Sequence, residues 1–294
     1  MLRLIDRRQP ASAEVWSTSM AGRIVHSNFR IDPGASVRVA AQMPEFVPEP
    51  PGQPSTTIDA QLGGTLHKVR ISAGVADQRR FQFEHGLTLR IAGQTAEVTA
   101  PTEESRRDVV EALLGPGLLL LCARHGAFAL HAAAVADTRG IVLLAGPSGQ
   151  GKSSLARLAA NPIAGPSGPI LRVADDLVVL GGDFGFCTNV PQLKLDPILL
   201  PAPVSTHLRN IVWPEFDDAI TTPVLRPLSP VEMRLRLIRD SVAARLFDAN
   251  ELAAHLGWVT RLSQHVPGFV LRRPRVDPAL IGIANRHSLD LLIT

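Results

Sequence analysis

Residues 146–153 read GPSGQGKS, which matches the phosphate-binding pattern G-x-x-x-x-G-K-S. The apolar run IVLLA at residues 141–145 precedes the motif, and the helix-like run SLARLAA at residues 154–160 follows it. Glycines let backbone N–H groups close around a phosphate, and the positive end of the next helix points at the same anion. The sequence therefore predicts a phosphate-binding loop between a buried strand and a helix. A glycine-rich turn with a chance lysine is the alternative.

The motif also assigns roles to individual side chains. Lys152 is expected to contact the β- and γ-phosphates, and the Ser153 hydroxyl is expected to complete the coordination of a bound Mg²⁺. The chain has only three lysines among 30 basic residues, so a chance lysine at this position is less expected. ATP and Mg²⁺ are the implied cofactors. The predicted nucleotide-binding residues are Gly146, Pro147, Ser148, Gly149, Gln150, Gly151, Lys152, Ser153 and Ser154.

A pair of carboxylates, Asp175 and Asp176, ends the apolar run at residues 170–174. Phosphoryl transfer needs one acid to hold Mg²⁺ and a second to orient or deprotonate the attacking hydroxyl. Adjacent carboxylates repel each other unless a cation or proton intervenes, so a metal site explains the pair well. A solvated turn is the alternative. A further acidic pair, Asp217 and Asp218, is flanked by prolines and is predicted to lie in a loop.

His131 is a third candidate, within a predicted strand at residues 128–135. A lone histidine in an alanine-rich strand is most often a buried residue with its hydrogen bonds satisfied. On the strand alone, both the structural and the functional interpretation stay open.

Three segments in this order resemble the catalytic domain of the HPr serine kinase/phosphorylase family: LHAAAV at residues 130–135, GPSGQGKS, and VADD at residues 173–176. The P-loop of that family resembles the one in phosphoenolpyruvate carboxykinase. The resemblance covers about residues 125–200. It implies an α/β fold with a P-loop kinase core of the HPr kinase/PEP carboxykinase-like type.

The resemblance also implies site roles. His131 approaches the γ-phosphate and the Asp pair, while Lys152 and Ser153 bind phosphate and metal. By analogy with P-loop enzymes in which the first acid after the strand serves the metal, Asp175 binds Mg²⁺ and Asp176 acts as the base. The predicted catalytic residues are therefore His131, Lys152, Asp175 and Asp176, and the predicted metal ligands are Ser153 and Asp175.

The chain departs from that family in three places. The second signature of the bifunctional enzymes, Glu-Arg-Gly-Leu-Gly-Ile, is absent, and VPQLKL at residues 190–195 stands there instead. Lys194 in this segment is either a phosphate ligand or an exposed lysine. A Gly/Pro-rich insert occupies residues 164–169, and the N-terminal part is unlike that of the family. The chain looks closer to HPr-kinase-related proteins found beside peptide-modification genes, including kinases of lasso-peptide precursors.

The composition argues against nucleic acid and a membrane as partners. With 294 residues, 45% hydrophobic and 19% charged, the chain is expected to be globular. The net charge of +3 comes from scattered arginines, and with no tyrosine and 4% aromatic residues the chain lacks stacking platforms for nucleic acid. The longest apolar stretch, residues 118–122, is far below the roughly 18 residues that cross a membrane.

The N-terminal sequence and the two cysteines predict a cytoplasmic protein. Its N-terminus does not resemble a signal peptide, and two cysteines, Cys122 and Cys187, lie in apolar surroundings that suit reduced thiols. The sequence also allows a disulfide between them, and it leaves open whether the chain is a homo-oligomer.

Two domains are predicted: a small β-rich N-terminal domain at residues 1–100 and the catalytic domain at residues 101–294, with a helical C-terminal part. Alternating runs at residues 81–83 and 87–91 indicate strands, and the prolines of residues 44–54 indicate an exposed loop. A helical pattern begins at Glu103, is interrupted at residues 115–117, and resumes to about Arg124.

Near the C-terminus, apolar residues are spaced for the buried face of a helix: Leu235, Leu237, Ile238, Val242, Leu246 and Phe247. Beyond them Arg272, Arg273 and Arg275 surround a predicted strand end. These guanidinium groups either hold a nucleotide or phosphorylated product, or form a solvated basic edge.

The function predicted from these features is transfer of the γ-phosphoryl group of ATP to a hydroxyl, a serine on a peptide or protein substrate. One alternative is a regulatory module that binds ATP without spending it. Another is a kinase for the hydroxyl group of a small molecule.

Overall fold

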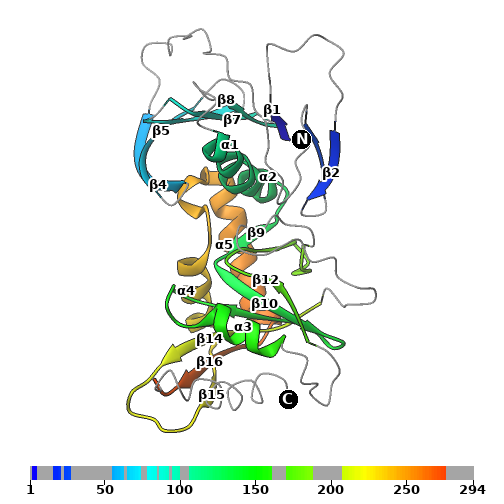
Figure 1. The fold of residues 1–294 in the computed structure, drawn as a ribbon, viewed down its shortest axis with the longest axis vertical. Coiled ribbons are helices and arrows are strands. Elements are labelled where there is room, and N and C mark those ends of the chain that lie inside the picture. Colours follow the sequence, from blue (N-terminus) through cyan, green and yellow to red (C-terminus); the bar gives the residue numbers. More distant parts are fainter. Residues whose placement is uncertain are drawn as a thin grey trace. The chain divides into compact units, whose positions relative to one another are not determined.

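The computed structural model describes residues 2–4, 16–20, 23–27, 55–62, 65–73, 78–84, 86–92, 95–99, 106–160, 170–187 and 207–275. The chain forms two compact units, Met1–His125 and Gly126–Thr294. Both contain sheets and helices, so the predicted α/β class is confirmed in general terms (Figure 1). The predicted loop at residues 44–54, the insert at residues 164–169 and Lys194 lie outside the described residues. None of the described helices is long and apolar enough to cross a membrane.

The first unit is built on a six-stranded sheet, which confirms the prediction of a β-rich N-terminal part. The order β1-β8-β7-β6-β5-β4 comprises β1 (Leu2–Leu4), β4 (Ser55–Leu62), β5 (Thr65–Ala73), β6 (Gln78–Phe83), β7 (Thr88–Ala92) and β8 (Thr95–Thr99). Strands β4 to β8 form an antiparallel meander. Strand β1 pairs in parallel with β8, the last strand of the meander. A separate hairpin pairs β2 (Trp16–Met20) with β3 (Arg23–Ser27).

A helical segment completes this unit. It runs through α1 (Arg106–Ala112), the π-helical turn η2 (Leu113–Gly117) and α2 (Leu118–Arg124). The predicted interruption at residues 115–117 is thus a π turn that accommodates Pro116 and leaves the chain helical. A Cβ on Gly117 would lie 3.4 Å from Leu89 of β7. The helices therefore pack on this sheet and belong to the first unit, whereas the predicted boundary near residue 100 groups them with the catalytic part.

The second unit contains another six-stranded sheet, in the order β12-β10-β11-β14-β16-β15. Strands β11, β14 and β16 are parallel, and β10 is antiparallel to both β11 and β12. Strand β12 therefore runs in the same direction as β11. The strands are β10 (Ala132–Asp137), β11 (Gly140–Ala145), β12 (Leu171–Ala174), β14 (Leu208–Phe216), β15 (Val224–Pro227) and β16 (Gly268–Arg273).

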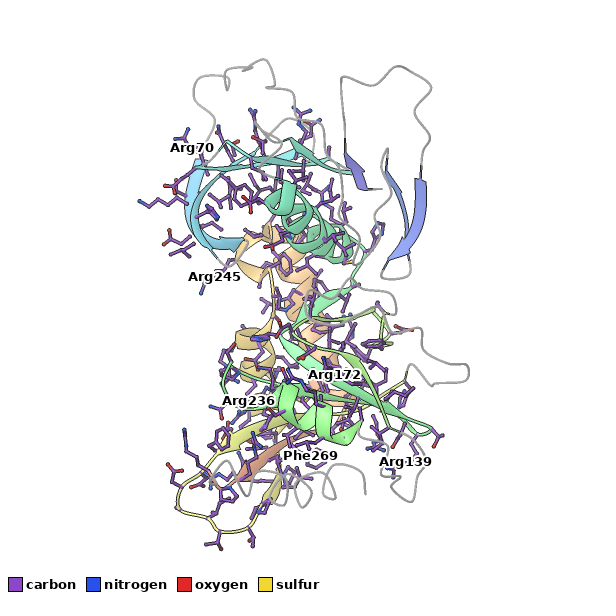
Figure 2. The ribbon with its side chains drawn as sticks, viewed as in Figure 1. Arg70, Arg139, Arg172, Arg236, Arg245 and Phe269 are labelled. Atoms are coloured by element: carbon purple, nitrogen blue, oxygen red, sulfur yellow. The ribbon has the colours of Figure 1, made fainter. Side chains whose placement is uncertain are left out.

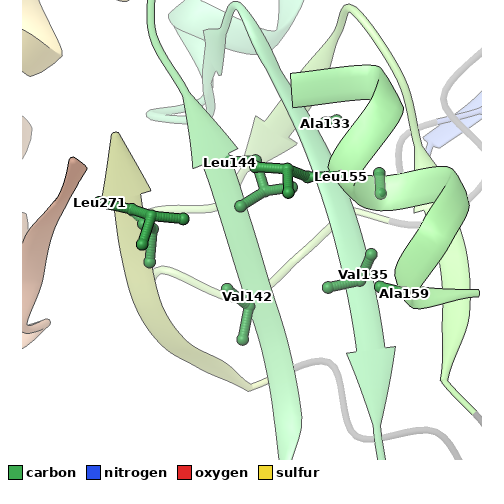
Figure 3. Close-up of a cluster of buried hydrophobic side chains, with 9 residues drawn as sticks. Ala133, Val135, Val142, Leu144, Leu155, Ala159 and Leu271 are labelled. Atoms are coloured by element: carbon green, nitrogen blue, oxygen red, sulfur yellow. The ribbon is translucent and has the colours of Figure 1, made fainter. Parts of the chain in front are cut away.

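Helix α3 (Lys152–Ala159) overlaps the end of the GPSGQGKS motif, as predicted, and lies over one face of this sheet (Figure 1). Its buried residues Leu155, Ala156 and Ala159 pack against the strands, and Figure 3 shows Leu155 between Ala133 and Leu144. Burial of this apolar face fixes the helix, because a helix of eight residues is not stable alone. The sheet residues of this cluster are Ala133, Val135, Val142, Leu144, Val212 and Leu271.

The predicted strand at residues 128–135 is two strands. β9 (Phe128–Leu130) pairs with β13 (Val178–Leu180), and β10 begins after His131 in the large sheet. A tight turn at residues 138–139 joins β10 to β11. There the Asp137 carboxylate accepts hydrogen bonds from the backbone of Arg139 and Gly140.

The C-terminal helical prediction is only partly right. Helix α4 (Pro230–Asp240) begins at a Ser229/Glu232 capping box and ends at Asp240, before the last three residues of the predicted face. Met233 and Leu237, four residues apart, form its buried face, while Leu235 is 66% and Ile238 42% exposed. The chain continues through η3 (Ala244–Leu246) to α5 (Ala249–His265).

Candidate active site

Strand directions bring the predicted site residues to one edge of the large sheet. The carboxyl ends of β11, β12, β14 and β16 meet there, together with the amino end of β10. His131 precedes β10, the GPSGQGKS loop follows β11, and Asp175 follows β12. Arg139, labelled in Figure 2, marks the β10–β11 turn at the opposite end of those strands. Binding at the carboxyl ends of strands is the usual arrangement in α/β sheets.

The loop has the backbone that its glycines allow. Gly146, Gly149 and Gly151 have φ angles of 124°, 84° and 74°, in the region that other residues seldom adopt. Lys152 is only 6% exposed, and its ammonium group donates to the carbonyl oxygens of Gly146 (2.7 Å) and Pro147 (2.8 Å). The lysine therefore lies inside the curve of the loop, where a phosphate-binding cation is expected. Ser148 and Ser154 are exposed.

The residues predicted to serve the metal are in direct contact. The Ser153 hydroxyl, in the first turn of α3, donates to Asp175 Oδ1 at 2.6 Å. The other carboxylate oxygen, Oδ2, lies 3.3 Å from the Arg172 guanidinium, which comes from β12 and is labelled in Figure 2. Asp175 is only 2% exposed. Its carboxylate is therefore held by contacts on both oxygens.

Asp176 has a different environment. Its carboxylate lies 4.0 Å from Nε2 of His131, and both side chains are about one third exposed, at 33% and 34%. Asp176 has a φ of 73°, which aspartate tolerates better than most residues. The backbone N–H of His131 donates to the Asp240 carbonyl at 2.8 Å, and this hydrogen bond fixes the backbone position of the histidine. The adjacent carboxylates thus differ: one is buried and bonded to the loop, and the other is accessible.

A second set of contacts holds the loop from the side of β16. The Arg273 guanidinium donates to the Gln150 carbonyl oxygen at 2.6 Å and lies 4.4 Å from the centre of the Phe216 ring. The Gln150 side chain accepts from the Phe216 backbone N–H at 3.2 Å. Arg273 is 6% exposed, and burial lowers its pKa to about 10. The interpretation as a solvated edge is therefore wrong for Arg273.

The two neighbouring arginines do match a solvated edge. Arg272 is 54% exposed and lies 3.4 Å from the Asp217 carboxylate. Arg275 is 69% exposed and lies 3.7 Å from Asp218. Asp217 and Asp218 follow β14 outside any helix or strand, so their predicted loop position is confirmed.

Beneath the first glycine of the loop lies Trp213 of β14. A Cβ on Gly146 would lie 3.4 Å from the indole ring. The indole N–H donates to the Asp240 carboxylate at 2.7 Å, and Asp240 is the same residue whose carbonyl accepts from His131. Asp240 therefore connects the base of the loop to the backbone of His131.

The Ser153–Asp175 pair fits Mg²⁺. Its donor atoms are hard oxygens, and Mg²⁺ is typically held by one or two carboxylates together with substrate phosphates and water. In the described part of the chain, no group of three or more histidine, cysteine or acidic residues is placed to hold a metal ion.

A scan against models of protein families found no match to this chain, and neither did a search of curated proteins.

The structure brings together Ser153 with Asp175 and His131 with Asp176, and it places Lys152 inside the loop. The sequence interpretation missed Arg172, although its position three residues before Asp175 was a signal. It also missed Trp213 and Asp240, which no local pattern marks.

Proposed function

We propose that this chain is an ATP-dependent kinase of the HPr-kinase-like kind, with a P-loop kinase core of the HPr kinase/PEP carboxykinase-like type in its second unit. It transfers the γ-phosphoryl group of ATP to a hydroxyl, a serine on a peptide or protein substrate. The observation that carries the proposal is the different environment of the two adjacent carboxylates. Asp175 accepts a hydrogen bond from Ser153, and Asp176 is one third exposed beside His131.

In this mechanism the loop and Lys152 bind the phosphates. The backbone N–H groups at the start of α3 would donate to the anion, because Gly151 at the N-cap has no side chain to accept their hydrogen bonds. Ser153 and Asp175 would hold Mg²⁺, which when bound neutralises charge on the β- and γ-phosphates. Arg172 keeps the Asp175 carboxylate oriented toward Ser153.

Asp176 is the base. The acceptor hydroxyl approaches from the exposed side of Asp176, and its oxygen forms a bond to the γ-phosphorus while the bond from that phosphorus to the β-phosphate oxygen breaks. The hydroxyl proton passes to the Asp176 carboxylate, and ADP leaves. His131 lies close enough to interact with Asp176, since its Nε2 atom is 4.0 Å from that carboxylate.

The test is transfer of label from γ-labelled ATP with Mg²⁺. Candidate acceptors are HPr, a precursor peptide encoded beside the gene, and free serine. We expect acid-stable label on one acceptor, as for a phosphoester, and loss of that label with Asp176→Asn. Tight ATP binding with no labelled acceptor and no effect of Asp176→Asn would favour the regulatory module. Label on free serine alone would favour the small-molecule kinase.

A further inference from the structure

Arg273 makes an unusual contact with the phosphate-binding loop. It is separated from Gln150 by 123 residues, yet its Nη2 atom donates to the Gln150 carbonyl at 2.6 Å. The same guanidinium occupies the space beside Gly151: a Cβ there would overlap Nη2 and would lie 3.2 Å from Cζ. Two features therefore favour glycine at position 151: its φ of 74°, and the neighbouring arginine, which leaves no space for a Cβ.

Strand register explains how Arg273 reaches the loop. Arg273 ends β16 two residues after Leu271, so both side chains lie on the sheet face that α3 covers. Phe216 is the partner of Arg273 in β14, and its ring lies against the guanidinium. The Phe216 backbone in turn donates to the Gln150 side chain. Gln150 is thus held at two atoms by the ends of two parallel strands.

The geometry of a peptide bond gives this contact a functional consequence. In a trans peptide the C=O and the following N–H point in opposite directions. Because Arg273 holds the Gln150 carbonyl, the Gly151 N–H points away from the guanidinium. Backbone N–H groups at this position of a P-loop motif are the ones expected to bind phosphate.

From these contacts we infer that Arg273 is a positioning residue for phosphate binding: it orients the Gln150–Gly151 peptide so that the Gly151 N–H is directed at the phosphates of the nucleotide. This inference rests on the proposed function, because it assumes that the loop binds ATP. Arg273 acts through the backbone of the loop and not by proton transfer. It should therefore affect nucleotide binding far more than the chemical step.

The experiment compares two neighbouring arginines. Arg273→Met removes the charge and the hydrogen bond while keeping an unbranched side chain. Arg272→Met makes the same change on the opposite face of β16, at an exposed residue paired with Asp217. Mg·ATP affinity is measured by calorimetry, and kcat and KM by phosphoryl transfer, on the full chain.

We expect Arg273→Met to weaken Mg·ATP binding and raise KM by about 10- to 100-fold, the worth of a hydrogen bond to a charged group, with kcat within about threefold. Arg272→Met should leave both values within about threefold. Arg273→Lys, which keeps a positively charged donor group, should recover part of the loss. Wild-type affinity in Arg273→Met, or an equal loss in Arg272→Met, would overturn the inference.

A double variant tests whether Gly151 and Arg273 act through the same contact. Gly151→Ala alone should weaken binding, because alanine would meet Arg273 and would have to adopt a positive φ. Since both changes disturb one contact, the double variant Gly151→Ala/Arg273→Met should bind about as weakly as the weaker single variant. Fold changes that multiply would show independent effects and refute the inference. A wild-type chain that does not bind Mg·ATP would overturn the proposed function as well.

Discussion

Replacing the two adjacent carboxylates one at a time should give two different defects. Asp175 is 2% exposed and contacts Ser153 and Arg172, which is itself mostly buried. Removing one partner of a buried ion pair costs about 3–5 kcal/mol, and asparagine keeps the acceptor for Ser153, so we take about 3 kcal/mol for Asp175→Asn. For a unit of this size that corresponds to a melting temperature lower by roughly 6–12 °C.

Asp176→Asn should behave in the opposite way. The side chain is one third exposed, and asparagine tolerates a positive φ as aspartate does, so stability should change by no more than about 0.5 kcal/mol. Loss of the base should lower phosphoryl transfer by about 10²- to 10⁴-fold while ATP binding stays nearly intact. Asp175→Asn, by contrast, should raise the Mg²⁺ concentration required for transfer.

The assay pairs thermal unfolding with label transfer across a Mg²⁺ titration. Asp218→Asn serves as the control, because it removes the same charge from a side chain that is 79% exposed. If Asp175→Asn and Asp176→Asn give the same melting temperature and the same Mg²⁺ dependence, the assignment of separate roles is wrong. The site itself would still be testable through Lys152.

Three further changes test Lys152 in the loop and two buried residues elsewhere in the second unit. Lys152→Ala should weaken ATP binding in calorimetry and abolish transfer, because no other lysine lies in the motif; unchanged ATP turnover would contradict the loop assignment. Burial lowers the pKa of His255, so the folded state binds protons less readily than the unfolded state; the free energy of unfolding should fall as pH drops below about 6.5, and less so in His255→Phe. Asp240→Asn should lower the unfolding free energy by about 1.5–3 kcal/mol by weakening the hydrogen bond from Trp213, measured by denaturant titration.

Local sequence was enough to predict the secondary structure around Lys152. The strand, loop and helix around Lys152 are adjacent in the chain, and glycine positions in such a loop follow from backbone sterics. The two carboxylates end an apolar strand, so their position at a sheet edge could also be predicted. What local sequence cannot supply is which distant strand lies beside the loop, and Arg273 reaches Gln150 from 123 residues away.

Two errors in the elements have physical causes. Residues 128–135 are almost uniformly apolar, and β9 and β10 are buried throughout, so no alternation marked the break at His131. The predicted buried face of the C-terminal helix included Val242, Leu246 and Phe247, which follow the end of α4 at Asp240. The capping box of Ser229 and Glu232 was readable in the sequence and identifies the start of the helix, from which Met233 and Leu237 follow as the buried face.

The loop is fixed from two sides by strands that are not neighbours. On one side, Asp175 after β12 bonds to Ser153, and on the other, Arg273 of β16 bonds to the Gln150 carbonyl. Strands β10, β11 and β14 lie between these two anchors in the sheet order. The conformation of the loop therefore depends on the register of the sheet from β12 to β16, because a shift of either of these two strands moves one anchor. Preorganisation of this kind is what phosphoryl transfer requires of a protein, since catalysis there consists mainly of positioning and electrostatic stabilisation.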